Sequence, residues 1–311
     1  MALDGSKIKA NASKHKAMSY SRLVRKEEEL KKEVERLLAD AERRDREEDR
    51  LYGDARGDEL PAELAFRESR LKKIREAKAA LEQEAKEEAE GEARRQEERT
   101  KEREKKEAAQ GRRFGGNPPR IPDPGKAVPK PQKQKNFTDP ESCLMADGAT
   151  GGFIQAYNAH VAVDEQNQVI VACALSSQPN DTLAFLPLLL EIDTQLGRLP
   201  QKVSADSGFY SHANVRDAQS RGLDCHVPPQ RRAVDPVAQE MRAKLRSPAG
   251  KDLYRRRKAV VEPVFGQIKG SRGFRQFSFR GREAVGDEWR LICLTHNLLK
   301  LFRAGVVLEP A

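Results

Sequence analysis

Large apolar residues in the first third of the chain recur at helical spacing among charged ones. They occupy positions 23, 30, 34, 37 and 38, and after a break at residues 52–61 they resume at positions 64, 71, 74 and 81. Seven-residue spacing between charged flanks predicts two helices that fold back on each other as a coiled-coil hairpin. No large apolar residue lies between Leu81 and Phe114, which predicts either a solvated helix or disorder there. We therefore expect a charged helical, coiled-coil segment over residues 20–110.

The pattern changes after residue 110. Residues 111–136 contain six prolines, which predict an extended linker because proline lacks the N–H and the backbone freedom that a helix needs. Strand-like runs then cover residues 152–163, 168–176, 201–205 and 223–227, and helix-like runs cover residues 181–196, 211–221, 260–269 and 287–302. A hairpin followed by alternating strands and helices predicts an α/β fold, a mixed sheet with helices on its faces.

Composition limits the class of protein. Of the 311 residues, 34% are charged and only 37% are apolar, which is too polar for one uniform globule. No apolar run approaches the roughly 20 residues needed to cross a bilayer. The first residues also lack the basic-then-apolar pattern of a signal peptide, so we expect a cytoplasmic protein with no membrane partner. Four scattered cysteines indicate buried thiols rather than a disulfide framework or a zinc site.

Positive charge is concentrated in one stretch of the chain. Residues 229–282 contain fifteen Lys or Arg against four Asp or Glu, whereas the net charge of the whole chain is +9. Such a block favours binding to a polyanion, because neutralised phosphates release their counterions. The simpler interpretation is a solvated loop rich in arginine.

Three carboxylates stand out by their positions. Asp206 comes where a predicted strand gives way to Ser207 and Gly208, a usual place for a functional group in such sheets. Asp4 precedes a glycine, and Glu262 precedes Pro263, which predicts that Glu262 lies at the start of a helix. Taken singly, these residues also fit a helix cap, a turn and a surface carboxylate favoured by the helix dipole.

Together the three acids favour a metal site. Mg²⁺ prefers carboxylate and water ligands, and two such ions about 4 Å apart can activate an attacking oxygen and stabilise a leaving one in phosphodiester chemistry. The five histidines are dispersed. Lys269 lies two turns beyond Glu262 on nearly the same helix face, where a cation could meet a phosphate.

The sequence resembles the DDE transposases of bacterial insertion sequences, which have a ribonuclease H-like catalytic domain. Residues 3–14 resemble the segment with the family's first aspartate, residues 205–211 the second, and residues 261–269 the glutamate helix. Residues 151–158 and 291–300 also resemble the first hairpin strand and the closing helix of this branch. The resemblance implies a first-strand region at residues 1–19, the coiled-coil insertion at 20–110, the linker at 111–136 and the main part of the catalytic domain at 137–311.

The resemblance also implies roles for particular residues. Asp4, Asp206 and Glu262 would be the catalytic residues and would hold two Mg²⁺ or Mn²⁺ ions. These ions would activate water and then a DNA 3′-hydroxyl, for cleavage and strand transfer at insertion-sequence ends. Further DNA contacts are expected from five residues in the basic block: Tyr254, Arg257, Lys258, Lys269 and Arg272. In the family's glutamate-helix signature the arginine is one residue closer to the glutamate than Arg257 is to Glu262, so Lys258 could take its place.

The N-terminus departs from the family. Only three residues precede Asp4, which suggests a truncated chain with a clipped first strand. The expected partners are double-stranded DNA, as transposon ends and target, and further copies of the chain in a homo-oligomer at the bacterial nucleoid. The alternative functions are a nuclease of the same fold that cuts without joining, a catalytically inactive truncated fragment that binds DNA or regulates transposition, and a structural coiled-coil protein.

Overall fold

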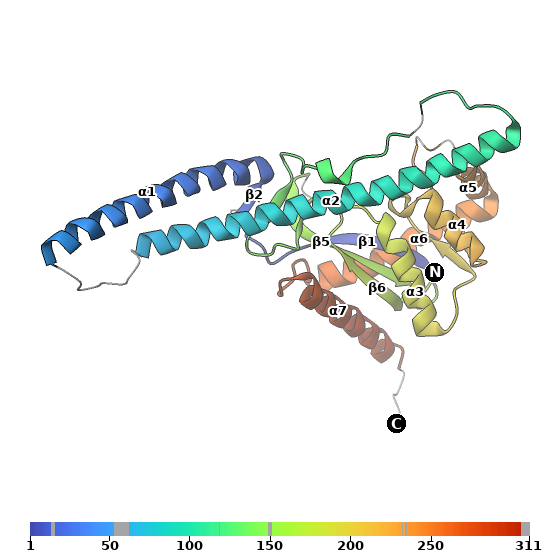
Figure 1. Ribbon diagram of the computed structural model, residues 1–311. Helices are drawn as coiled ribbons and strands as arrows, with labels where there is room; N and C mark the ends of the chain where they lie inside the picture. Colours follow the sequence, from blue (N-terminus) through green and yellow to red (C-terminus); the bar gives the residue numbers. More distant parts are fainter. Residues whose placement is uncertain are drawn as a thin grey trace. The chain divides into compact units, whose positions relative to one another are not determined.

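The computed structural model describes residues 1–13, 16–52, 62–117, 119–148, 151–231, 233 and 235–305 (Figure 1). Residues 41–42, 44–52 and 62–64 are described by their backbone only, so the break at residues 53–61 and the side chain of Leu64 lie outside the described part. The chain divides into two compact units. One unit combines Met1–Lys16 with Thr138–Ala311, and the other is the inserted segment Ala17–Phe137.

The inserted unit is built on two long helices. They are α1 (Tyr20–Tyr52) and α2 (Ala62–Gln110), and their buried contact is formed by Leu23, Leu30, Val34, Leu71, Ile74, Ala77 and Leu81. Arg67 pairs with Glu33 at 2.8 Å, and Lys78 pairs with Glu27 at 2.8 Å. Residues later in α2 therefore pair with residues earlier in α1. The two helices are therefore antiparallel, and α2 continues as a helix through the stretch that lacks large apolar residues.

The ends of the inserted unit lie side by side. Strand β2 (Ala17–Ser19) pairs antiparallel with β3 (Gln134–Asn136), and Ala17 stands opposite Asn136. The proline-rich stretch before β3 contains only one short 3₁₀ turn, η2 (Pro124–Lys126), within its described residues. Because the first and last residues of the insertion are paired, the chain leaves and re-enters the other unit at one place.

The other unit is formed around a mixed sheet. Its strands are β1 (Ala2–Lys9), β4 (Cys143–Ala146), β5 (Phe153–Val163), β6 (Ile170–Ser176), β7 (Lys202–Ser204) and β8 (Asp224–His226). The order is β4-β5-β1-β7-β8, and β6 also pairs with β5. β1 is antiparallel to β5 and parallel to β7, which in turn is parallel to β8. This arrangement is consistent with a ribonuclease H-like fold, and it confirms the predicted α/β class with a long charged helical insertion after the first strand.

Helices cover both faces of this sheet because side chains alternate along its strands. Leu3 and Ala162 lie in the core shared with α3 (Phe185–Leu196), α4 (His212–Ser220) and α5 (Pro236–Arg246). Ala2 and Val163 lie in a second core, with α6 (Pro248–Gly266) and α7 (Arg282–Arg303). Neighbouring residues of β1 thus face different helices. In the described part of the chain, no helix is long and apolar enough to cross a membrane.

Helix α6 begins much earlier than the pattern predicts. Glu262 was expected at the start of a helix because a proline follows it, but that expectation is wrong: the helix begins at Pro248, where the Ser247 Oγ accepts a hydrogen bond from the N–H of Gly250 at 3.0 Å. This cap and a proline in the first turn are strong start signals. Helix α5 and the strands β2, β3 and β4 were not anticipated.

A side chain compensates for Pro263 inside α6. Proline has no N–H for the carbonyl four residues earlier, which here belongs to Ala259. The Gln168 Nε2 donates to this oxygen at 3.0 Å from the turn between β5 and β6. The same amide accepts from the Lys300 Nζ at 3.0 Å, so one side chain ties α6 to α7.

We predict that Gln168→Met lowers the free energy of unfolding by about 1–2 kcal/mol, because it keeps the side-chain length and leaves the Ala259 carbonyl without its donor. Urea denaturation of the purified chain measures the change. Gln166→Met, on the exposed part of the same turn, is the matched control and should change stability little. Equal effects of the two substitutions would contradict the assigned role of the Gln168 amide.

Candidate active site

The two aspartates expected at the site lie on neighbouring parallel segments. Ala2 of β1 pairs in register with Ser204 of β7. Asp4 and Asp206 each follow this pair by two residues, so the parallel register brings them to the same level of the sheet. Asp4 accepts a hydrogen bond from the Gly5 N–H at 3.0 Å, and Asp206 accepts one from the Gly208 N–H at 2.9 Å. Asp206 thereby caps the short turn η4 (Ser207–Phe209).

Burial makes negative charge costly at both aspartates. The pKa of Asp4 is raised from 3.8 to about 6, mainly by burial and to a smaller extent by the charges of Asp206 and Asp181, against the opposing attraction of Arg257. Burial is also the main cause that raises the pKa of Asp206, followed by the charge of Asp181. The carboxylates therefore repel one another in a setting where a bound cation would be stabilising.

Arg257 is the cation nearest to this pair. Its side chain is only 8% exposed, and its Nη1 lies 3.5 Å from the Asp4 Oδ2, which is an ion-pair distance rather than a good hydrogen bond. The Nε and Nη1 atoms have no hydrogen-bond partner. The guanidinium also lies over the Tyr254 ring, 5.6 Å from its centroid. Arg257, which was expected to contact DNA, thus lies beside Asp4 with spare donors on its guanidinium, and Tyr254 packs against that guanidinium.

Two other expected DNA contacts are occupied within the chain. The Lys269 Nζ donates to the Ser6 Oγ at 2.5 Å and to the Lys7 carbonyl at 2.6 Å, and burial lowers its pKa. Lys269 belongs to η5 (Gln267–Ser271), which continues α6, so it ties this segment to β1. Arg272 donates to the Ile292 carbonyl of α7 at 3.1 Å. Lys258, in contrast, is exposed on α6.

Glu262 lies on the exposed side of α6. It follows Arg257 by five residues, which rotates it by about 140° around the helix from the side that faces Asp4. The charges that shift the pKa of Asp4 are those of Arg257, Asp206 and Asp181, and the charges that shift the pKa of Asp206 are those of Asp181 and Arg257. The structure thus brings Asp4 and Asp206 together and leaves Glu262 accessible to solvent on the neighbouring helix.

Asp181 is a third carboxylate at this site that sequence reasoning did not single out. It follows β6 and precedes the short turn η3 (Thr182–Ala184). Its Oδ1 accepts hydrogen bonds from the Asn158 Nδ2 at 2.8 Å and from the His160 Nε2 at 3.0 Å, and the bonds from these β5 residues hold its pKa below the usual value despite burial. Asp181 lies five residues after the end of β6 and directly before a helical turn, and Asp206 likewise lies directly before one; this shared position was the available signal.

The donor chemistry of the site fits a hard divalent cation. Asp4 and Asp206 offer carboxylate oxygens, the ligands that Mg²⁺ and Mn²⁺ prefer. Their raised pKa values indicate negative charge that the surrounding protein does not fully compensate. Among the described residues, no three His, Cys, Asp or Glu side chains are already arranged as a metal centre. Asp4 and Asp206 are therefore the residues best suited to act as the first ligands of a metal ion.

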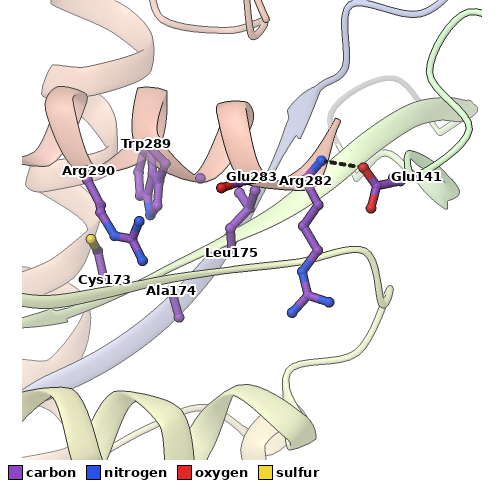
Figure 2. Close-up of a pocket in the computed structure, with 9 residues that line it drawn as sticks. Glu141, Cys173, Ala174, Leu175, Arg282, Glu283, Trp289 and Arg290 are labelled. Carbon is purple, nitrogen blue, oxygen red and sulfur yellow. Dashed lines mark hydrogen bonds between the residues drawn. The ribbon is translucent and has the colours of Figure 1, made fainter. Parts of the chain in front are cut away.

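A cavity lies elsewhere in this unit, between β6 and the first half of α7 (Figure 2). It has a volume of about 400 Å³ and is lined by Glu141, Cys173, Ala174, Leu175, Arg282, Glu283, Gly286, Trp289 and Arg290. Glu141 accepts a hydrogen bond from the Arg282 N–H at 2.8 Å and so caps the start of α7 (Figure 2). None of the expected catalytic carboxylates lines this cavity.

Comparison with known families identifies the class of domain. Residues 125–298 match the model of the transposase DDE domain, which covers more than half of the chain. The chain therefore belongs to the DDE transposase domain family. The matched range includes Asp206 and Glu262, and β1 with Asp4 precedes it. A comparison with curated proteins found no significant match.

We predict that Asp4→Asn stabilises the fold at neutral pH. The pKa of Asp4 is raised from 3.8 to about 6, so its stabilising contribution is complete below pH 3.8 and is lost as pH rises through 6. The variant should be more stable than the parent chain by about 2–3 kcal/mol at pH 7 and should differ little from it near pH 4.

Urea denaturation from pH 4 to 7.5 with a chelator present measures this difference. Asp193→Asn, on the exposed side of α3, is the control. A constant offset between Asp4→Asn and the parent chain across this range would contradict the assigned burial of Asp4.

Proposed function

We propose that this chain is a transposase that cleaves DNA at insertion-sequence ends and joins the 3′-hydroxyl to target DNA. The proposal rests mainly on the register of β1 and β7, which brings Asp4 and Asp206 to one level in a member of the DDE transposase domain family. Glu262, exposed on the adjacent helix, completes the proposed catalytic set.

Each proposed catalytic residue has a distinct part. Two Mg²⁺ or Mn²⁺ ions, when bound, would supply Lewis-acid activation of water or of the DNA 3′-hydroxyl. Asp4 and Asp206 would hold these ions from partly buried positions. Glu262 would join them from the side open to solvent and to DNA. Arg257 would hold a phosphate oxygen next to the carboxylates, because its Nε and Nη1 are buried without hydrogen-bond partners.

Binding to the DNA backbone is proposed for the exposed face of α6. Arg255, Arg256 and Lys258 are exposed there, within the most basic stretch of the chain. Lys269 and Arg272 would not contact DNA themselves but would hold the end of α6 in place, through their hydrogen bonds to β1 and α7. Function on paired transposon ends would require a homo-oligomer, and we propose that the chain acts on the bacterial nucleoid in the cytoplasm.

One observation favours the alternative of a DNA-binding fragment without catalytic activity. The Arg257 guanidinium already partly neutralises Asp4 at 3.5 Å, in the place where a metal ion would lie. A chain held in this arrangement would retain its basic surface and would bind metal poorly. The two functions differ in whether a divalent ion displaces this contact.

We predict that the chain cleaves DNA that carries the element's own ends in the presence of Mg²⁺ or Mn²⁺. Asp206→Ala and Glu262→Ala should each lower the cleavage rate at least about 100-fold, because each removes a charged ligand from the reacting centre. Gel analysis of end-labelled DNA measures cleavage, and joined products would separate a transposase from a simple nuclease.

The dependence of DNA binding on salt concentration completes this test. Salt-sensitive binding without cleavage would support the inactive fragment. Absence of binding at low salt would contradict both DNA functions and would favour a structural role. Asp217→Ala, on α4 away from the basic block, is the control for loss of a carboxylate and should cleave as the parent chain does.

A further inference from the structure

The Asp181 side chain lies between the two segments that carry the proposed catalytic aspartates, in contact with both. A Cβ atom built on Gly5 would lie 2.6 Å from the Asp181 Oδ1 and 2.8 Å from the His160 Cδ2. A Cβ atom built on Gly208 would overlap the Asp181 Oδ2 even more closely. Gly5 follows Asp4 directly, and Gly208 lies two residues after Asp206. The Asp181 carboxylate therefore contacts both segments at the glycines whose N–H groups bind the aspartates.

The Asp181 side chain is held where it stands. Asn158 and His160, both buried on β5, donate to its Oδ1 at 2.8 and 3.0 Å. Their strand is paired with β1 over the full length of β1, so the donors are fixed relative to Asp4. An added methyl group at either glycine could not be accommodated by a simple rotation of Asp181, because rotation would break these two bonds.

The loop of Asp206 is joined to the segment of Asp181 by further bonds. The Thr182 Oγ1 donates to the Gly208 carbonyl at 2.9 Å. The Asn214 Nδ2 donates to the Thr182 carbonyl at 2.8 Å and to the Phe209 carbonyl at 2.9 Å. The register of β7 with β1 is limited to one pair, Ala2 with Ser204. The separation of the two aspartates is thus governed by contacts beyond the strand ends as well as by sheet pairing.

We propose that Asp181 is a positioning residue that sets the separation between Asp4 and Asp206, and that Gly5 and Gly208 are required because its carboxylate fills the space beside them. Asp181 acts through the backbone of the two segments rather than as a metal ligand, because its Oδ1 accepts two hydrogen bonds from β5 and its Oδ2 lies against Gly208. The link to metal binding rests on the proposed function, whereas the steric contact does not.

The test is a set of double-mutant cycles between Gly208 and Asp181, in which Mn²⁺ affinity and Tm are measured. Gly208→Ala is made in the parent chain, in Asp181→Asn, which keeps the volume, and in Asp181→Ala, which removes it. Asp181→Ser repeats the last background with a residual hydroxyl acceptor, in case the alanine variant does not fold. Gly286→Ala is the control, because the added methyl group would meet no other residue within 4 Å. It should leave the Mn²⁺ affinity unchanged and, as a substitution inside α7, should raise the Tm slightly instead of lowering it.

The first measurement is Mn²⁺ affinity by calorimetry. Gly208→Ala should weaken binding about 10-fold or more in the parent chain and in Asp181→Asn, as expected when an outer contact that orients ligands is lost. In Asp181→Ala or Asp181→Ser the same substitution should cost less than about 2-fold. Equal losses in every background would overturn the proposal, and so would a loss in Asp181→Asn alone as large as that in Asp206→Asn, because Asp181 would then be a ligand.

The second measurement is the Tm without metal. Gly208→Ala should lower the Tm in the parent chain and in Asp181→Asn, and lower it much less in Asp181→Ala or Asp181→Ser. This coupling tests the steric contact between Asp181 and Gly208 even if the parent chain binds no Mn²⁺. Failure to bind Mn²⁺ would count against the proposed function and not against this contact. Independent Tm losses in all backgrounds would show that the glycine is needed for another reason and would overturn the proposal.

Discussion

The pairing of β1 with two different neighbours is the constraint on which the site depends. β1 pairs antiparallel with β5 through eight residue pairs and parallel with β7 near its first residues, although residues 17–137 intervene between β1 and the rest of the sheet. The insertion can be long because Ala17 pairs with Asn136, so that its two ends meet. Closing such a loop costs entropy that grows only slowly with length. The proposed catalytic aspartate on β1 is therefore compatible with a large helical unit placed directly after its strand.

The same pairing places like charges together in a buried setting. Asp4 and Asp206 repel, Asp181 adds to the repulsion, and Arg257 offsets it only in part. A fold selected for stability alone has no use for this arrangement, whereas a site that binds a divalent cation gains from charge held in place before the ion arrives. The backbone N–H groups of Gly5 and Gly208 fix each carboxylate, and Asp181 fills the space between these glycines. The site is thus held by two local hydrogen bonds, from Gly5 and Gly208, and by the contact of Asp181 with both glycines.

Much of this fold could be predicted from the sequence, because its elements carry local signals. The seven-residue seam predicted the helices of the insertion, and the alternation around residues 152–176 predicted the hairpin of β5 and β6. The start of α6 was missed because Pro263 suggested a helix start, and the compensating donor, Gln168, is nearly a hundred residues away. Asp181 was missed for a similar reason: its partners Asn158 and His160 come from a different strand. Motif segments marked Asp4, Asp206 and Glu262, but only the strand register could bring the first two to one level.

The central claim is that the partly buried pair of Asp4 and Asp206 binds a divalent cation. The most direct measurement is a crystal structure of the chain grown with Mn²⁺, with data collected to locate manganese by its anomalous scattering. The account predicts a manganese peak in contact with carboxylate oxygens of both Asp4 and Asp206, with the Arg257 guanidinium moved away from Asp4. An ordered site without manganese, in which Arg257 still pairs with Asp4, would contradict it.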